Sequence, residues 1–101
     1  MILERGCTPI HTFEFSYTAD ELETVQIVYQ QNGAIILEKG KEDLAFDGTV
    51  ATLQLTQAET LLFAAKGTVK VQIRWKRITG EAEKTEVFYL TPDELLKEDE
   101  I

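Results

Sequence analysis

The sequence contains very few of the residues from which catalytic and metal sites are usually built. Its 101 residues include one cysteine, one histidine, one serine and one tryptophan, which are Cys7, His11, Ser16 and Trp75. A single cysteine excludes an intramolecular disulfide and suits a reducing compartment. Cys7 and His11 lie four residues apart, about 13 Å along an extended strand, which is too far for a nucleophile and its base. We therefore expect no catalytic residue, no metal and no cofactor.

Positive charge and long apolar runs are also scarce. Ten basic and eighteen acidic residues give a net charge of −8. This balance argues against non-specific binding to nucleic acid or to anionic membranes, since both require positive potential. No apolar run approaches the roughly 20 residues needed to span a bilayer, and the N-terminus lacks the architecture of a signal peptide. We expect a protein that is cytoplasmic where it is made, with neither nucleic acid nor membrane among its partners.

Alternation of apolar and polar residues is the dominant pattern. It predicts one strand over residues 49–55 and another over residues 69–75, because period two marks a strand with one buried face. Further strands are expected over residues 11–17, 24–31, 34–39, 44–46 and 83–90. The dipeptide Asn32-Gly33 between two such runs predicts a tight hairpin. About seven short strands in one domain favour an all-β antiparallel sandwich, with a partly open barrel as the alternative.

One short helix is expected between the strands predicted over residues 49–55 and 69–75. Thr56 and Glu59 have the spacing of a capping box, and good helix formers follow them. Gly67 stands where a left-handed cap is favoured. The pattern predicts a helix over Gln57–Ala65 that ends at Gly67.

The C-terminal segment differs in composition from the rest. Thr91 to Glu94 form a second capping signature, with Pro92 at the first helical position. We expect a sandwich domain over residues 1–92 and an acidic tail over residues 93–101 that is a frayed helical turn or disordered. The acidic residues of the tail are Asp93, Glu94, Glu98, Asp99 and Glu100.

A basic face is the main candidate for an interaction site. Lys70, Arg74 and Lys76 share the polar side of one central strand. A solvated strand face is the commoner explanation of such charges. The alternative is a contact surface on which the acidic tail of a neighbouring copy docks. Trp75 shares the apolar side, so we expect it in the core, and we expect His11 at the core's rim without a partner.

Four segments carry a resemblance to known proteins: RGCTPIHTFEF, YQQNG, LTQAETLLF and KGTVKVQIRW. Together they resemble a group of small proteins encoded among the structural genes of prophages in Gram-positive bacteria. The matching positions are Gly6, Thr8, Pro9, His11, Thr12 and Phe13, followed by Leu55, Thr56, Gln57, Glu59 and Thr60. The similarity spans residues 5–89. The chain is also similar, to a lesser extent, to the immunoglobulin-like N-terminal domain of phage baseplate upper proteins.

This resemblance implies an immunoglobulin-like sandwich that is virion-associated or acts in tail assembly. Its partners would be other phage structural proteins or further copies of itself. No catalytic residue carries over from the group. The alternative function is a carbohydrate-binding module that uses Tyr17, Tyr29 or Phe88 as exposed aromatics. A small enzyme is the third hypothesis, but no recognisable set of catalytic residues supports it.

Overall fold

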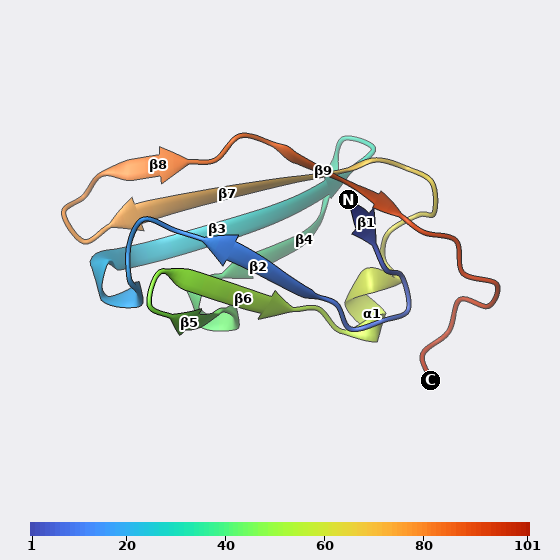
Figure 1. Cartoon of the computed structure of the whole chain (residues 1–101). Helices are drawn as coiled ribbons and strands as arrows, with labels where there is room; N and C mark the ends of the chain where they lie inside the picture. The colour runs from blue at the N-terminus through green and yellow to red at the C-terminus, as the bar shows by residue number, and fades with distance from the viewer.

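The computed structural model describes residues 1–101 and contains two β-sheets packed as a sandwich (Figure 1). The strands of the large sheet, in spatial order, are β1 (Ile2–Leu3), β9 (Phe88–Pro92), β7 (Val69–Arg77), β3 (Leu22–Gln31) and β4 (Ala34–Gly40), and β8 (Ala82–Lys84) also pairs with β7. The small sheet consists of β2 (Ile10–Glu14), β6 (Val50–Gln54) and β5 (Ala45–Asp47). Two 3₁₀ turns, η1 (Ala19–Glu21) and η2 (Lys41–Asp43), flank β3 and β4. The predicted sandwich is confirmed, and the barrel alternative is wrong.

The core lies between the sheets and follows the predicted alternation. Every second residue of the long strands points inward, so each strand delivers a row of apolar side chains. The rows are Val25, Ile27 and Tyr29 from β3, Val69, Val71 and Ile73 from β7, and Ala51 and Leu53 from β6, all buried. Trp75 packs edge-on against Phe15, with ring centroids 5.5 Å apart, and joins the core as expected.

The hairpin between β3 and β4 has the predicted tight turn. Asn32 and Gly33 both have positive φ, 54° and 77°, as a type I′ turn requires. The register then shifts between Tyr29 and Gln30, which places a bulge in β4. Because of this bulge, Leu37 opposes the inward Tyr29 while Ile35 opposes Gln30 on the outer face.

The last predicted strand, over residues 83–90, divides into β8 and β9. Thr85 lies at the break. Its Oγ1 accepts a hydrogen bond from the Ile73 N–H at 3.2 Å, and its own N–H donates to the Ile73 carbonyl at 2.9 Å. The side chain thus takes the place of a main-chain acceptor, and the regular ladder to β7 stops there.

The helix of the corner is shorter than expected. The α1 helix spans only Gln57–Thr60, although its capping box is present: the Glu59 N–H donates to Thr56 Oγ1 at 3.1 Å, and the Thr56 N–H donates to Glu59 Oε1 at 2.9 Å. The prediction that it reaches Ala65 is wrong because the Gln31 side chain takes both backbone groups of Ala64. This clamp turns the chain so that Phe63 enters the core.

The residue with left-handed backbone after the corner is Lys66, at φ 65°, and not Gly67. Gly67 is needed for another reason. A Cβ at this position would lie 2.6 Å from Nε2 of Gln31, the side chain that holds the corner. The sequence pattern therefore predicted correctly that the helical corner ends near Gly67. It was wrong about why glycine is needed there, which is the space for the Gln31 side chain and not a left-handed backbone.

The capping signature at Thr91 opens no helix. Thr91 and Pro92 belong to β9 and pair in parallel with Ile2 and Leu3 of β1. The Asp93 N–H then donates to the Leu3 carbonyl at 3.1 Å, so the backbone is committed to the sheet where a helix would begin. No residue of the tail is helical.

His11 does have a partner, contrary to expectation. Its Nδ1 lies 2.6 Å from the Tyr29 hydroxyl, and the two rings are stacked with centroids 5.8 Å apart. His11 comes from β2 and Tyr29 from β3, so this hydrogen bond joins the two sheets. Burial lowers the pKa of His11 and raises the pKa of Tyr29.

The His11 contact makes stability depend on pH. The pKa of His11 in the fold lies below its ordinary 6.5, so the unfolded chain binds the proton more readily. The free energy of unfolding should be level above pH 6.5 and fall as the pH drops toward the lowered pKa, by about 1.4 kcal/mol for each unit of lowering. Urea unfolding at about pH 7.5 and about pH 5.5 measures this, with His11→Asn as the control that removes the titration. Equal pH dependence in the two proteins would contradict this assignment.

Candidate functional site

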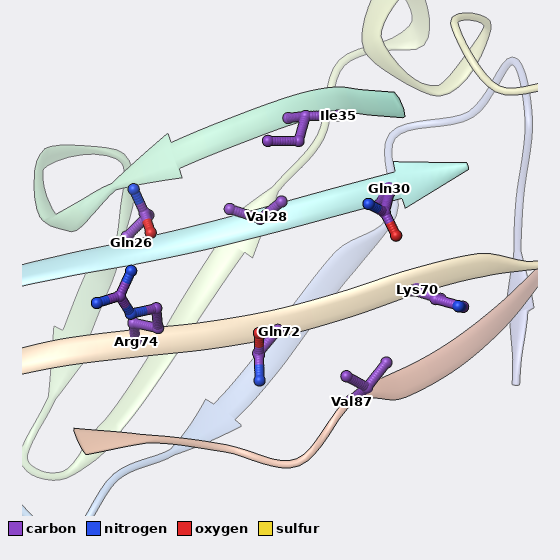
Figure 2. A pocket seen from close by; sticks show the side chains of 8 residues that line it. All are labelled: Gln26, Val28, Gln30, Ile35, Lys70, Gln72, Arg74 and Val87. Atoms are coloured by element: carbon purple, nitrogen blue, oxygen red, sulfur yellow. The ribbon is translucent and has the colours of Figure 1, made fainter. Parts of the chain in front are cut away.

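A depression of about 260 Å³ marks the outer face of the large sheet (Figure 2). It runs across β4, β3 and β7 and ends at the segment between β8 and β9. Its lining residues are Gln26, Val28, Gln30, Ile35, Lys70, Gln72, Arg74 and Val87. This face is turned away from the small sheet, so no element of the fold covers it.

The antiparallel register of β3 and β7 builds the depression from three cross-strand pairs. Gln30 opposes Lys70, Val28 opposes Gln72, and Gln26 opposes Arg74. The neighbours of these residues along each strand point into the core, so these side chains must point outward. The composition of the core thus determines which residues form the site.

Two cations of the depression have no ion-pair partner. Lys70 and Arg74 are exposed and take part in none of the salt bridges of the structure. Lys76, the third predicted member of the basic face, lies further along β7 and pairs with Glu23 at 3.4 Å. The structure therefore brings Lys70 and Arg74 together in one hollow and leaves Lys76 outside it.

Apolar side chains share the rest of the surface with three glutamines, Gln26, Gln30 and Gln72. Ile35 is 60% exposed and Val87 is 37% exposed, one on each side of the hollow. Tyr89 opposes Lys70 across the β7–β9 ladder and is largely exposed, so it extends the same face. A surface of apolar side chains with two free cations suits an acidic protein segment that carries apolar residues.

The aromatics proposed for carbohydrate stacking do not gather at one place. Tyr29 is fully buried, so it offers no platform. Tyr17 lies under the Arg77 guanidinium, 4.4 Å from its ring centroid, and its hydroxyl donates to Glu83. Phe88 opposes Val71 and therefore lies on the inner side of its strand, although its ring is partly exposed at the edge.

The acidic tail lies against its own domain, at a site centred on Arg5. Asp93 Oδ1 accepts from the Arg5 backbone N–H at 2.9 Å, and Glu98 Oε1 accepts from Arg5 Nη2 at 2.6 Å. Glu94 is 4.0 Å from Lys66. Asp99 lies near Lys97 within the tail, and Glu100 takes part in no salt bridge.

Arg5 was missed in the sequence because it belongs to an apparent lead-in. Its side chain is only 3% exposed, and its Nε donates to the Phe63 carbonyl at 2.8 Å. It therefore connects the first strand, the corner and the tail. No local sequence pattern could predict the role of Arg5, since its partners are 58 and 93 residues away in sequence.

The remaining site classes find no support in the described residues. No group of three or more His, Cys, Asp and Glu side chains is placed to hold a metal ion, and Cys7 is exposed and unpaired. None of the helices has the length and apolar character needed to cross a membrane.

Comparison with known proteins identifies the fold. No protein-family model and no curated protein matches the chain. Among solved structures it is similar to a strand-swapped dimer of the immunoglobulin-like domain of mouse leukocyte-associated immunoglobulin-like receptor 1, with 11% identity, a TM-score of 0.53, and coverage of 93% of this chain and 88% of that one. The V domain of amphioxus IgVJ-C2 aligns with 13% identity over 89% of this chain and 96% of that one, at a TM-score of 0.35. The predicted immunoglobulin-like β-sandwich is confirmed.

Removal of Arg5 should be far more damaging than removal of its tail partner. We expect Arg5→Ala to lower the free energy of unfolding by about 2–4 kcal/mol, because it leaves the Phe63 carbonyl without its donor and opens a space in the corner. Glu98 is 58% exposed. Glu98→Gln should therefore cost less than about 1 kcal/mol. Urea unfolding compares the two, and equal losses would show that Arg5 acts only through its surface ion pair.

Proposed function

We propose that this chain is a phage-type structural or assembly domain that acts by binding other proteins, without catalysis. The observation that carries the proposal is the uncovered outer face of the large sheet, where Lys70 and Arg74 stand unpaired among glutamines and apolar side chains. The resemblance of the Gly6–Phe13 and Leu55–Thr60 motifs to prophage structural-gene products supports the phage setting. The protein would be cytoplasmic when made and virion-associated after assembly.

The binding partner should be an acidic segment with apolar side chains. Two free cations on a domain of net charge −8 attract such a segment, whereas the acidic remainder of the surface repels it. The segment of this chemistry within the chain is the tail, in which Leu96 is fully exposed and Glu100 has no ion pair. The Arg5 anchor holds Asp93 and Glu98 and leaves these two residues free for a neighbouring copy.

A tail of one copy on the face of the next is a head-to-tail contact. Contacts of this kind form rings if the rotation closes and open filaments if it does not. Self-association also has a precedent in this fold, since the similar mouse receptor domain was solved as a strand-swapped dimer. An acidic segment of another phage structural protein would present the same chemistry to the same face.

Light scattering after size-exclusion chromatography at about 50 mM and about 500 mM salt tests the tail contact, because this range screens surface charge. We expect an oligomer at low salt that falls to a smaller species at high salt, because the charged tail contact is then lost. Arg74→Glu and Glu100→Lys should each shift the low-salt oligomer toward this smaller species, and the double variant should restore it. Lys76→Glu is the matched control, since it reverses one charge on an exposed lysine of the same strand outside the depression.

A wild-type chain with the same mass at both salt concentrations would contradict the tail contact. The partner would then be the acidic segment of a different structural protein. Failure of the double variant to restore the oligomer would separate Arg74 from Glu100 and contradict their pairing.

A further inference from the structure

The strand β2 has a hydrogen-bonding neighbour on one side only. It is an end strand of the small sheet and pairs with β6 alone (Figure 1). Two backbone bonds just outside β2 fix which of its groups face β6: the Phe15 N–H donates to the Thr49 carbonyl, and the Leu55 N–H donates to the Pro9 carbonyl. Residues 9, 11, 13 and 15 therefore face β6, because antiparallel ladders bond through every second residue.

The open side of β2 presents the backbone groups of Ile10, Thr12 and Glu14. All three residues are exposed, and their backbone groups appear in none of the hydrogen bonds made outside the strand ladders. The side chain of Ile10 is 60% exposed beside them. These are three consecutive sites at which another strand can be added.

The fold leaves room for that strand. Immunoglobulin sandwiches of the constant type have four strands in the corresponding sheet. The small sheet of this chain has three, because the N-terminal strand β1 pairs with β9 in the large sheet. No described residue occupies the place beside β2.

Other edges of the sandwich are poorer templates. The strands β1, β8 and β5 have two or three residues each. The longer edge strand β4 carries the bulge opposite Tyr29 and Gln30, and a bulge twists an edge away from regular pairing. The strand β2 is regular over its five pairs with β6.

We infer that β2 is a self-association site, to which a second copy of this chain adds its own β2 antiparallel about a two-fold axis at Thr12. In this register Thr12 opposes Thr12 and Ile10 opposes Glu14 of the second copy. The outward-facing groups of one strand then meet the outward-facing groups of the other, as a ladder requires. Paired threonines are favourable, and no like charges stand opposite each other. The sequence of the edge is thus complementary to itself.

Charged side chains introduced at the two-fold axis test the inference. The charged variants are compared in about 150 mM salt on a Glu100→Lys background, which removes the tail contact and lets like charges at the axis repel. The wild type is measured by sedimentation equilibrium in about 500 mM salt, which isolates this contact from the tail contact because backbone hydrogen bonds are not screened. We expect the wild type to dimerise under these conditions. Thr12→Lys and Thr12→Glu should each raise the dimer dissociation constant by about fivefold, since each places like charges directly opposite. An equimolar mixture of the two variants should dimerise again.

Two further variants separate the contact from folding. Thr12→Pro removes only an N–H that faces away from β6, so its circular dichroism should match the wild type while the dimer is lost. Thr12→Val keeps the shape and adds no charge, so it should dimerise as the wild type does, and Arg74→Glu should have no effect. A wild-type monomer under these conditions, a Thr12→Pro protein that still dimerises, or a mixture that fails to re-form the dimer would each overturn the inference.

Discussion

The pairing of β3 with β7 is the constraint on which the rest of the structure depends. The two strands are in register from Thr24 and Lys76 at one end to Gln31 and Val69 at the other. A slip of one residue would bury Lys70 and Arg74 and expose the core, at a cost no surface contact could offset. The core therefore specifies the register, and the register specifies the outer face. The candidate site is a consequence of the same alternation that folds the domain.

The sandwich holds its sheets together without the disulfide that antibody domains place between them. The direct polar link between the sheets here is the hydrogen bond between His11 of β2 and Tyr29 of β3. A hydrogen bond contributes about 1 kcal/mol net, against about 2–4 kcal/mol for a disulfide, so the apolar rows must supply most of the stability. Gln31 and Arg5 add hydrogen bonds at the corner, where the chain leaves regular structure. This arrangement suits a chain with a single cysteine.

Sequence reasoning succeeded wherever a pattern is local. Alternation located most strands, Asn32-Gly33 located the hairpin, and the capping box located the start of α1. It failed where a distant residue decides the outcome. Gln31 ends the helix, β1 draws Thr91 and Pro92 into the sheet, and Arg5 binds the tail, all across long stretches of chain. In the candidate site, the apolar–polar alternation of β7 correctly predicted that Lys70 and Arg74 point outward. The positions of Ile35 and Val87 depend on the bulge in β4 and on the break between β8 and β9, and a regular alternation of residues cannot predict either irregularity.

The two proposed contacts use different sheets, and this separates them physically. The outer face belongs to β3, β4 and β7 of the large sheet, whereas the open edge belongs to β2 of the small one. The first contact is electrostatic and head-to-tail, so it weakens with salt and can repeat from copy to copy into a ring or a filament. The second is made of backbone hydrogen bonds about a two-fold axis, so it resists salt and ends at two copies. One copy can therefore take part in both at once, and two-fold pairs joined through their tails would build a lattice or a closed shell of dimers, which neither contact produces alone.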